Sequence, residues 1–252
     1  MHSWNRRLRA SGVHLGISLV IAALAGVLVF GLWYPYPYRE LSGGRSLFLL
    51  IVAVDVVMGP LITLVVFNQS KSRRELIVDL SIVGALQLAA LCYGLWTVSV
   101  ARPVHLVFEY QRLSVVHASD IDPEVLAKAE PEFRALPWAG PTLMALRPFR
   151  SPNERMEATL AALSGASLPA RADLWQSYEA SRSEILAASR PLAELQSKWP
   201  DRAADLAKEA QTTGHSVDQL RYLPVHGRSL IWTALLDPQT LRPLRFVPLD
   251  PY

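Results

Sequence analysis

The chain has 252 residues, of which 51% are hydrophobic and 19% are charged, with a mean hydropathy of +0.20, and a charged fraction this low disfavours a disordered chain. Residues 1–99 contain 8 Lys and Arg against 4 Asp and Glu, and residues 100–252 contain 17 against 18, so no basic face is left for nucleic acid. The single cysteine, Cys92, lies in an apolar run and excludes a disulfide framework or a cysteine zinc site within one chain.

Three long apolar runs occupy the first hundred residues, and we predict that they form a three-helix transmembrane domain over residues 1–101. Their only acidic residues are Asp55 in the second run and Asp79 near the start of the third. About 20 apolar residues cross a hydrocarbon core of roughly 30 Å, so each run is long enough to span a membrane. Buried helices of a soluble protein are the alternative, which three such runs in one hundred residues make a poor explanation. The predicted spans are residues 13–34, 46–67 and 76–100.

Basic residues beside the spans predict their orientation. They precede the first span and lie between the second and third, at Arg6, Arg7, Arg9, Lys71, Arg73 and Arg74. Positively charged loops stay in the cytoplasm, so three spans place residues 102–252 on the outer side. A cleaved signal peptide is the alternative at the N-terminus. An uncleaved anchor is favoured because the apolar stretch continues to Trp33 and Tyr34 without a polar break.

An aromatic, proline-rich segment follows the first span. Pro35 and Pro37 end the helix there, because proline lacks the backbone N–H that a helix interior needs. Aromatic residues at the end of a span are typical of the interfacial belt between lipid and water. We therefore predict such a belt, in contact with the lipid bilayer, at Trp33, Tyr34, Tyr36 and Tyr38.

Residues 102–252 are long enough for one domain with its own core, and their pattern runs from strands to helices and back to strands. This order predicts an α+β domain with an antiparallel sheet. Pro243 and Pro248 favour an edge position for the last strand. The predicted strands are near residues 104–108, 113–116, 222–225, 229–236 and 241–249, and the predicted helices are residues 153–163, 172–188 and 201–210.

A search for chemistry finds no motif of an enzyme. The six histidines have no metal-binding spacing, and no P-loop, dinucleotide fingerprint or nucleophile elbow is present. We therefore expect no enzymatic activity, no metal and no cofactor. Asp55 and Asp79 raise the possibility of an intramembrane aspartyl protease, but they differ by more than roughly 10 Å in depth at 1.5 Å per residue. A carboxylate dyad must share one proton, which that separation prevents.

Asp55 is the most informative residue of the spans. An ionisable group in the middle of a membrane is costly unless it is paired or faces a cavity. Gln87 lies at a similar depth in the neighbouring span, so the two side chains are predicted to meet by a hydrogen bond. Gly59 and Pro60 interrupt the second span and are expected to kink it. Two interpretations stay open: these residues join two helices, or they face the helix of a partner protein.

Several motifs in order resemble the type IV pilin accessory proteins of Gram-negative bacteria, the TfpX/TfpZ group. The resemblance covers nearly the whole chain, with departures at Tyr252, where tryptophan is expected, and Leu241, where glycine is more common. The motifs are Trp33–Tyr38 with Gly43-Gly44, Val54–Leu64, Ala101–Val104 with Val107–Glu109, Asp173–Trp175, Trp232–Pro238 and Leu249–Pro251.

The resemblance implies an inner-membrane chaperone, with a periplasmic C-terminal domain, that stabilises one type IV major pilin before or during pilus assembly. On this hypothesis the partner-binding residues for the pilin helix are Asp55, Gly59, Pro60, Asp79 and Gln87. Asp79 would meet the amine of the pilin, although basic neighbours compete for it. The proline-rich edge near residues 241–249 is a candidate contact for the globular head. The alternative function is an assembly-platform subunit or a membrane-anchored sensor without client specificity.

Overall fold

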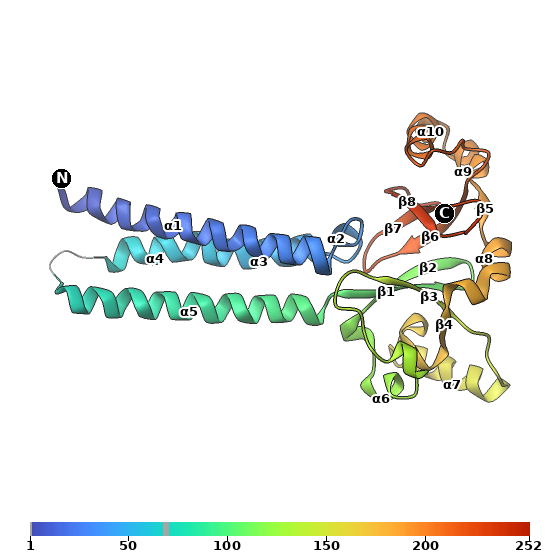
Figure 1. The fold of residues 1–252 in the computed structure, drawn as a ribbon, viewed down its shortest axis with the longest axis horizontal. Coiled ribbons are helices and arrows are strands. Elements are labelled where there is room, and N and C mark those ends of the chain that lie inside the picture. The colour runs from blue at the N-terminus through green and yellow to red at the C-terminus, as the bar shows by residue number, and fades with distance from the viewer. Residues whose placement is uncertain (1, 68–70) are drawn as a thin grey trace. The chain divides into compact units, whose positions relative to one another are not determined.

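The computed structural model describes residues 2–67 and 71–252, with side chains from Trp4 onward. Residues 68–70, which belong to the loop predicted to be cytoplasmic, lie outside the described residues. The chain forms two compact units (Figure 1). The helical unit comprises Met1–Pro35 and Gly44–Ala101, and the sheet unit comprises Tyr36–Gly43 and Arg102–Tyr252. The loop that joins the first two long helices is therefore part of the sheet unit.

Three helices of the helical unit are long and apolar enough to cross a membrane, as predicted: Trp4–Trp33, Gly44–Val66 and Arg73–Val100. The first consists of α1 (His2–Leu28) and the π-helix η1 (Val29–Trp33). The second consists of α3 (Gly44–Ala53), the π-helix η2 (Val54–Met58) and α4 (Gly59–Val66). The third is α5 (Arg73–Val100), which begins at a capping box formed by Ser72 and Glu75.

The interruption predicted at Gly59-Pro60 takes the form of the π-helix η2 directly before it. Proline cannot donate the backbone hydrogen bond that would continue an α-helix, and a single wider turn accommodates the mismatch. Within the unit, α1 packs against η2 and α4, and α5 packs against α3, η2 and α4. The second helix thus lies between the first and the third (Figure 1).

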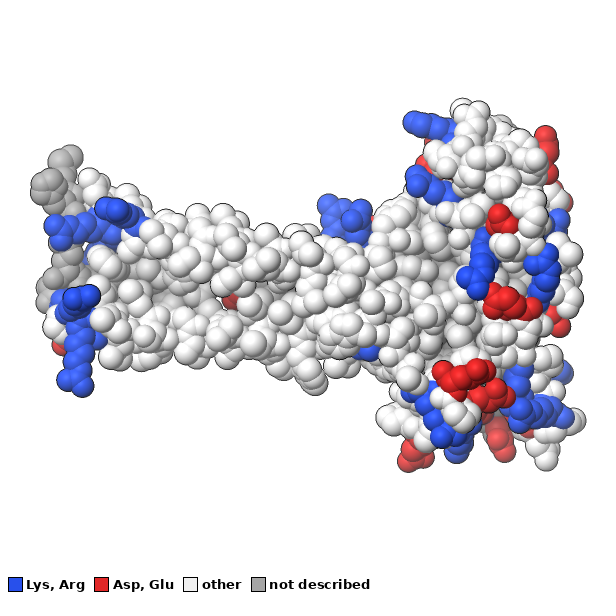
Figure 2. All heavy atoms as spheres, viewed as in Figure 1, with Lys and Arg blue, Asp and Glu red and all other residues white. Residues whose placement is uncertain are grey.

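Most of the apolar side chains in the helical unit face outward. Only 17%, 22% and 6% of the most apolar stretch of the three helices is buried within the protein. Figure 2 shows this surface almost free of charge between the ends of the unit. An apolar surface of this extent is unlike that of a soluble monomer, whose exposed apolar patches are small.

The sheet unit contains an eight-stranded sheet, in which seven strands follow the order β4-β3-β1-β2-β6-β7-β8 and β5 pairs with β6. The prediction of a purely antiparallel sheet is wrong, because β1 pairs with β3 and β2 with β6 in parallel. The edge position predicted from the prolines is confirmed, since β8 ends the sheet. The strands are β1 (Pro103–Glu109), β2 (Arg112–His117), β3 (Thr142–Leu146), β4 (Trp175–Ser177), β5 (Arg190–Pro191), β6 (Arg221–His226), β7 (Ile231–Leu236) and β8 (Pro243–Val247).

Short helices connect the strands. The predicted helix over residues 172–188 is wrong in its first half, because Trp175–Ser177 pairs with β3 as strand β4 and only Arg182–Ala188 forms an α-helix. A cross-strand pairing therefore overrides the local helical pattern. The α-helices are α2 (Tyr38–Leu41), α6 (Pro123–Leu126), α7 (Pro152–Leu163), α8 (Arg182–Ala188), α9 (Leu192–Lys198) and α10 (Ala203–Thr212).

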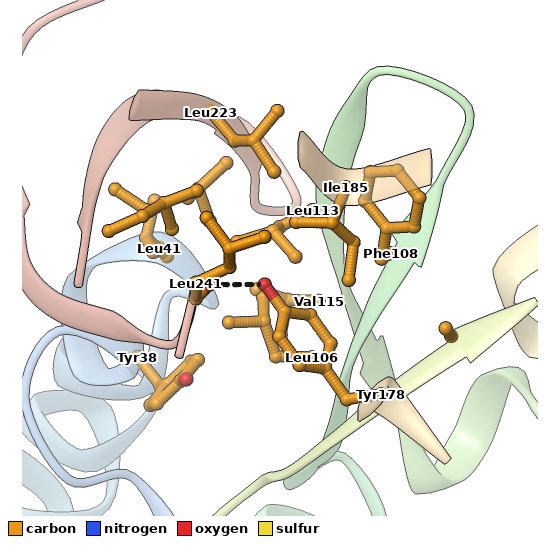
Figure 3. Packing of buried hydrophobic residues seen from close by; sticks show 14 residues of the cluster. Tyr38, Leu41, Leu106, Phe108, Leu113, Val115, Tyr178, Ile185, Leu223 and Leu241 are labelled. Atoms are coloured by element: carbon orange, nitrogen blue, oxygen red, sulfur yellow. Dashed lines mark hydrogen bonds between the residues drawn. The ribbon is translucent and has the colours of Figure 1, made fainter. Parts of the chain in front are cut away.

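Helix α2 is built into the main core of the sheet unit, although sixty residues separate it from β1. Leu41 is completely buried and Tyr38 nearly so, among apolar side chains of β1, β2, β6 and β7 (Figure 3). The carbonyl oxygen of Leu41 accepts a hydrogen bond from the backbone N–H of Arg228 at 2.9 Å. Gly227 permits this approach, because a Cβ at that position would collide with the same carbonyl group. The loop after the first span thus completes the sheet unit.

Leu241, one of the two departures from the pilin accessory pattern, has a backbone conformation that suits glycine. Its φ of 60° lies in the left-handed region, which L side chains rarely adopt. The side chain is nevertheless buried in the core beside Leu41, and the carbonyl accepts a 2.8 Å hydrogen bond from the Tyr178 hydroxyl (Figure 3). Burial of this side chain therefore opposes the strain of the turn.

Candidate partner-binding site

A polar residue lies at the centre of each long helix. Asp55 has eleven residues of Gly44–Val66 on either side, and Gln87 has 14 residues of Arg73–Val100 before it and 13 after. Ser18 has 14 residues of Trp4–Trp33 before it and 15 after. These three side chains line one cavity of about 150 Å³ between α1, η2 and α5. We call it the mid-span cavity; its other lining residues are His14, Ile17, Ile21, Gly84, Leu88 and Leu91.

Asp55 and Gln87 meet, as predicted, but through the backbone. The side-chain N–H of Gln87 donates to the carbonyl oxygen of Asp55 at 3.1 Å. Gly59 makes room for this contact, because a Cβ there would overlap the amide group of Gln87. The π-helical turn and the glycine beside it therefore allow α5 to approach the second helix at its centre.

One oxygen of the Asp55 carboxylate is buried without a hydrogen bond from the described residues. Asp55 is only 8% exposed. Within the described parts of the chain, its Oδ1 has no hydrogen-bond partner, and neither has the Oε1 of Gln87. An unsatisfied buried acceptor costs about 1–3 kcal/mol, and more when it is charged. Two buried acceptor atoms of residues that line the mid-span cavity thus have no hydrogen bond among the described residues.

Pro60 and its neighbours join the second helix to α1. The Ser11 hydroxyl donates to the carbonyl oxygen of Pro60 at 2.8 Å, and His14 Nδ1 lies 2.5 Å from Thr63 Oγ1. Pro60 is buried, so it is a packing residue between helices and does not line the mid-span cavity. A second cavity, of about 230 Å³, lies between α3 and α5 and also reaches Asp55.

Asp79 lies apart from these residues and already has a cationic partner. Its Oδ2 is 2.5 Å from the Nζ of Lys71, just before the start of α5. Among the five predicted partner-binding residues, the structure therefore brings Asp55, Gly59 and Gln87 together and places Pro60 and Asp79 in other contacts.

Three of the four aromatic residues predicted to form an interfacial belt are buried in the protein. Trp33 and Tyr34 are buried in the helical unit, where the Tyr34 hydroxyl donates to the carbonyl oxygen of Val98 at 3.2 Å. Tyr38 is buried in the sheet unit, and only Tyr36 is exposed. The prediction took aromatic residues at the end of a span for lipid contacts, whereas three of the four fill protein cores.

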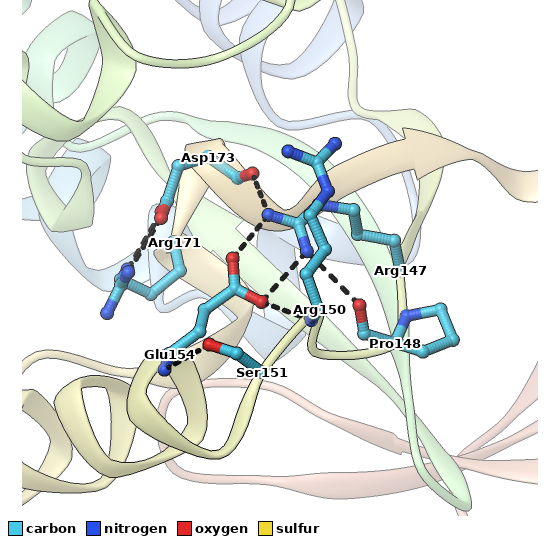
Figure 4. Close-up of polar contacts among 7 residues, drawn as sticks. All are labelled: Arg147, Pro148, Arg150, Ser151, Glu154, Arg171 and Asp173. Carbon is cyan, nitrogen blue, oxygen red and sulfur yellow. Dashed lines mark hydrogen bonds and ion pairs between the residues drawn. The ribbon is translucent and has the colours of Figure 1, made fainter.

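The sheet unit holds a larger cavity that the sequence did not suggest. It measures about 750 Å³ and is lined by α7 and by residues of β1, β3 and the loop after β3. One wall is held rigid by Arg147, whose guanidinium binds the Glu154 carboxylate at 2.6 Å (Figure 4). This side-chain hydrogen bond, with one from the backbone of Arg150, lowers the pKa of Glu154 to about 2. The contact joins residues seven apart across a turn, which no periodicity in the sequence marks.

The chain is similar to known fimbrial assembly proteins. The family model "Fimbrial assembly protein FimB" matches residues 2–43. The fimbrial assembly protein of Dichelobacter nodosus serogroup I is 36% identical over 231 residues, 91% of this chain and 90% of that protein. The serogroup E1 protein of the same organism is 37% identical over 232 residues, with the same coverage. The chain belongs to the fimbrial assembly protein family. No solved structure matches it.

The region that matches the family model coincides with an unusual part of the fold. Residues 2–43 hold the first apolar helix and the complete loop that enters the core of the sheet unit. In this fimbrial assembly protein, one continuous segment therefore contributes to both units. For the described residues, no group of three or more His, Cys, Asp or Glu side chains is arranged to hold a metal ion.

Proposed function

We propose that this fimbrial assembly protein is a non-enzymatic inner-membrane accessory protein that binds one type IV major pilin before or during pilus assembly. The names of its relatives support the assembly role, and the three apolar helices support insertion in a membrane. The basic residues at the N-terminus and before α5 favour a cytoplasmic position for both segments. The sheet unit then lies in the periplasm.

The observation that carries the proposal is the mid-span cavity in a helical unit whose apolar surface is largely uncovered. A pilin before assembly holds one apolar helix in the same membrane, and such a helix can lie against α1 and α5 over the cavity. Small residues at helix interfaces permit close approach in membranes. Gly84, on the cavity wall, has no atom within 4 Å of the position that a Cβ would occupy, so this wall is open to an incoming helix.

Site-specific photocrosslinking in cells tests the proposal. A photoreactive residue at Ile17 of α1 or Leu88 of α5, both in the cavity lining, is expected to capture the pilin. The matched controls are Leu24 and Leu86, which are 67% and 68% exposed and lie outside the cavity lining. Capture from positions in the sheet unit alone would refute a helix site in the membrane.

Pilin abundance distinguishes this role from the alternatives. A client-specific chaperone protects its pilin, so deletion is expected to deplete one pilin, with rescue by the cognate accessory protein only. Deletion of an assembly-platform subunit or a sensor without client specificity leaves the amount of pilin normal while assembly fails. The predicted contact between the head of the pilin and the β8 edge is a separate proposal, tested by crosslinking from Leu244, which is 43% exposed.

A further inference from the structure

We propose that the partner helix places a hydrogen-bond donor against Asp55 and Gln87 at the centre of the membrane. This inference rests on the proposed function and specifies the chemistry of its site. The mid-span cavity collects the central polar residue of each of the three long helices. A polar group at this depth is costly unless it has a partner, so three converging polar groups indicate a place where polar contacts are made.

The buried atoms of Asp55 and Gln87 that lack a partner among the described residues are acceptors. A side-chain N–H of Gln87 donates to the carbonyl oxygen of Asp55, whereas the Oε1 of Gln87 has no hydrogen-bond partner among the described residues. The same holds for the Oδ1 of Asp55 in the part of the chain that the structure describes. A group that satisfies both atoms must be a donor: a hydroxyl, an amide N–H or an ammonium.

The helical unit has no cation of its own at this depth. The sequence contains no Lys or Arg between Arg9 and Arg39, between Arg45 and Lys71, or between Arg74 and Arg102. His14 is the other titratable residue that lines the cavity, and its Nδ1 is already in contact with Thr63 Oγ1. Among the described residues no side chain of these helices donates to the Oδ1 of Asp55, so a donor on a partner helix can supply this contact.

The chemistry of the cavity favours a protein helix over the other possible occupants. A lipid chain fills apolar space but offers no donor, so it leaves both oxygen atoms unsatisfied. A second copy of this chain presents the same acceptors at the same depth. A helix with one donor in an otherwise apolar stretch satisfies the oxygen atoms and packs on the open wall at Gly84.

The test combines variants of Asp55 with mapping of the captured residue. In the full chain, Asp55→Leu is expected to lower crosslinking of the pilin from Leu88 at least tenfold. Asp55→Asn keeps an acceptor oxygen and is expected to retain most of the capture if the donor is neutral; loss in both variants indicates an ammonium donor. Protease resistance of each variant in membranes shows that the helices still fold. The Leu86 probe supplies the background.

Peptide mapping of the wild-type crosslink from Leu88 is independent of any variant. The labelled pilin residue is expected within one helical turn of a Ser, Thr, Asn, Gln or Lys side chain or a terminal amine. The inference is overturned if only apolar side chains lie within a turn of the label, or if Asp55→Leu captures pilin as well as the wild type does. In either case the proposed binding of the pilin helix at the mid-span cavity is not refuted. Absence of pilin label from both Ile17 and Leu88, or label on lipid or on a second copy alone, would instead refute the proposed function and this inference with it.

Discussion

Leu41→Ala tests whether the loop after the first span stabilises a unit that begins sixty residues later. The Leu41 side chain is completely buried in the main core of the sheet unit, with Tyr38, Leu106 and Leu113 in the same cluster. Truncation of a buried leucine to alanine costs about 2–5 kcal/mol, through lost burial and the cavity left behind. Because the site is fully enclosed, we expect a loss of about 3 kcal/mol in the free energy of unfolding.

The assay is thermal unfolding of the full chain in detergent, followed by near-UV circular dichroism. For a unit of this size, 1 kcal/mol shifts the unfolding temperature by roughly 2–4 °C, so a decrease of roughly 6–12 °C is expected. Arg39→Ala in the same loop is the matched control, because its side chain is 45% exposed and lies over the Tyr36 ring. An unfolding temperature within 1 °C of the wild type for Leu41→Ala would show that the loop is not part of the core, contrary to the packing argument.

Three further predictions concern separate parts of the molecule. His105 is buried beside Trp175, and this burial lowers the pKa of His105 from 6.5 to about 4. As the pH falls, the imidazole of His105 is protonated in the unfolded chain before it is protonated in the folded chain. The free energy of unfolding is therefore expected to decrease between pH 6.5 and pH 4, by roughly 3 kcal/mol in all. His105→Gln should flatten that slope in urea titrations, and an unchanged slope would assign it to other groups. Leu241→Gly relieves a left-handed φ worth roughly 1 kcal/mol but removes a buried leucine, so it is expected to destabilise by about 1–4 kcal/mol and no more than Leu241→Ala does. Greater stability than the wild type in chemical denaturation would contradict this ranking. Gly84→Leu fills open space on the wall of the mid-span cavity and is expected to abolish co-purification of the pilin without loss of the folded protein. Gly12→Leu, at another open position outside that lining, is its control, and equal co-purification for both would exclude this wall as the contact.

Local chemistry was enough to predict the three long apolar helices. Each long helix depends on a continuous apolar run, which is a property of neighbouring residues and is readable without a fold. The position of Asp55 at a cavity was predictable for the same reason, because a charge in such a run is costly unless it is paired or faces a cavity. Its contact with Gln87 followed from equal depth, whereas the use of the backbone carbonyl depended on the π-helical turn.

Tertiary packing decided the rest. Strand β4 lies in a segment with a helical pattern, and only its pairing with β3 makes it a strand. The parallel pairs of β1 with β3 and of β2 with β6 join segments far apart in the chain, and the local sequence of these segments does not specify the pairing. Tyr38 and Trp33 have the composition of an interfacial belt, but they are buried because protein cores lie within their reach. By itself, the sequence determined which segments are apolar enough for a membrane and where a polar group interrupts them. Only the tertiary structure decided which aromatic residues face protein, and which buried acceptor atoms lack a hydrogen bond among the described residues, because both depend on contacts between residues far apart in the chain.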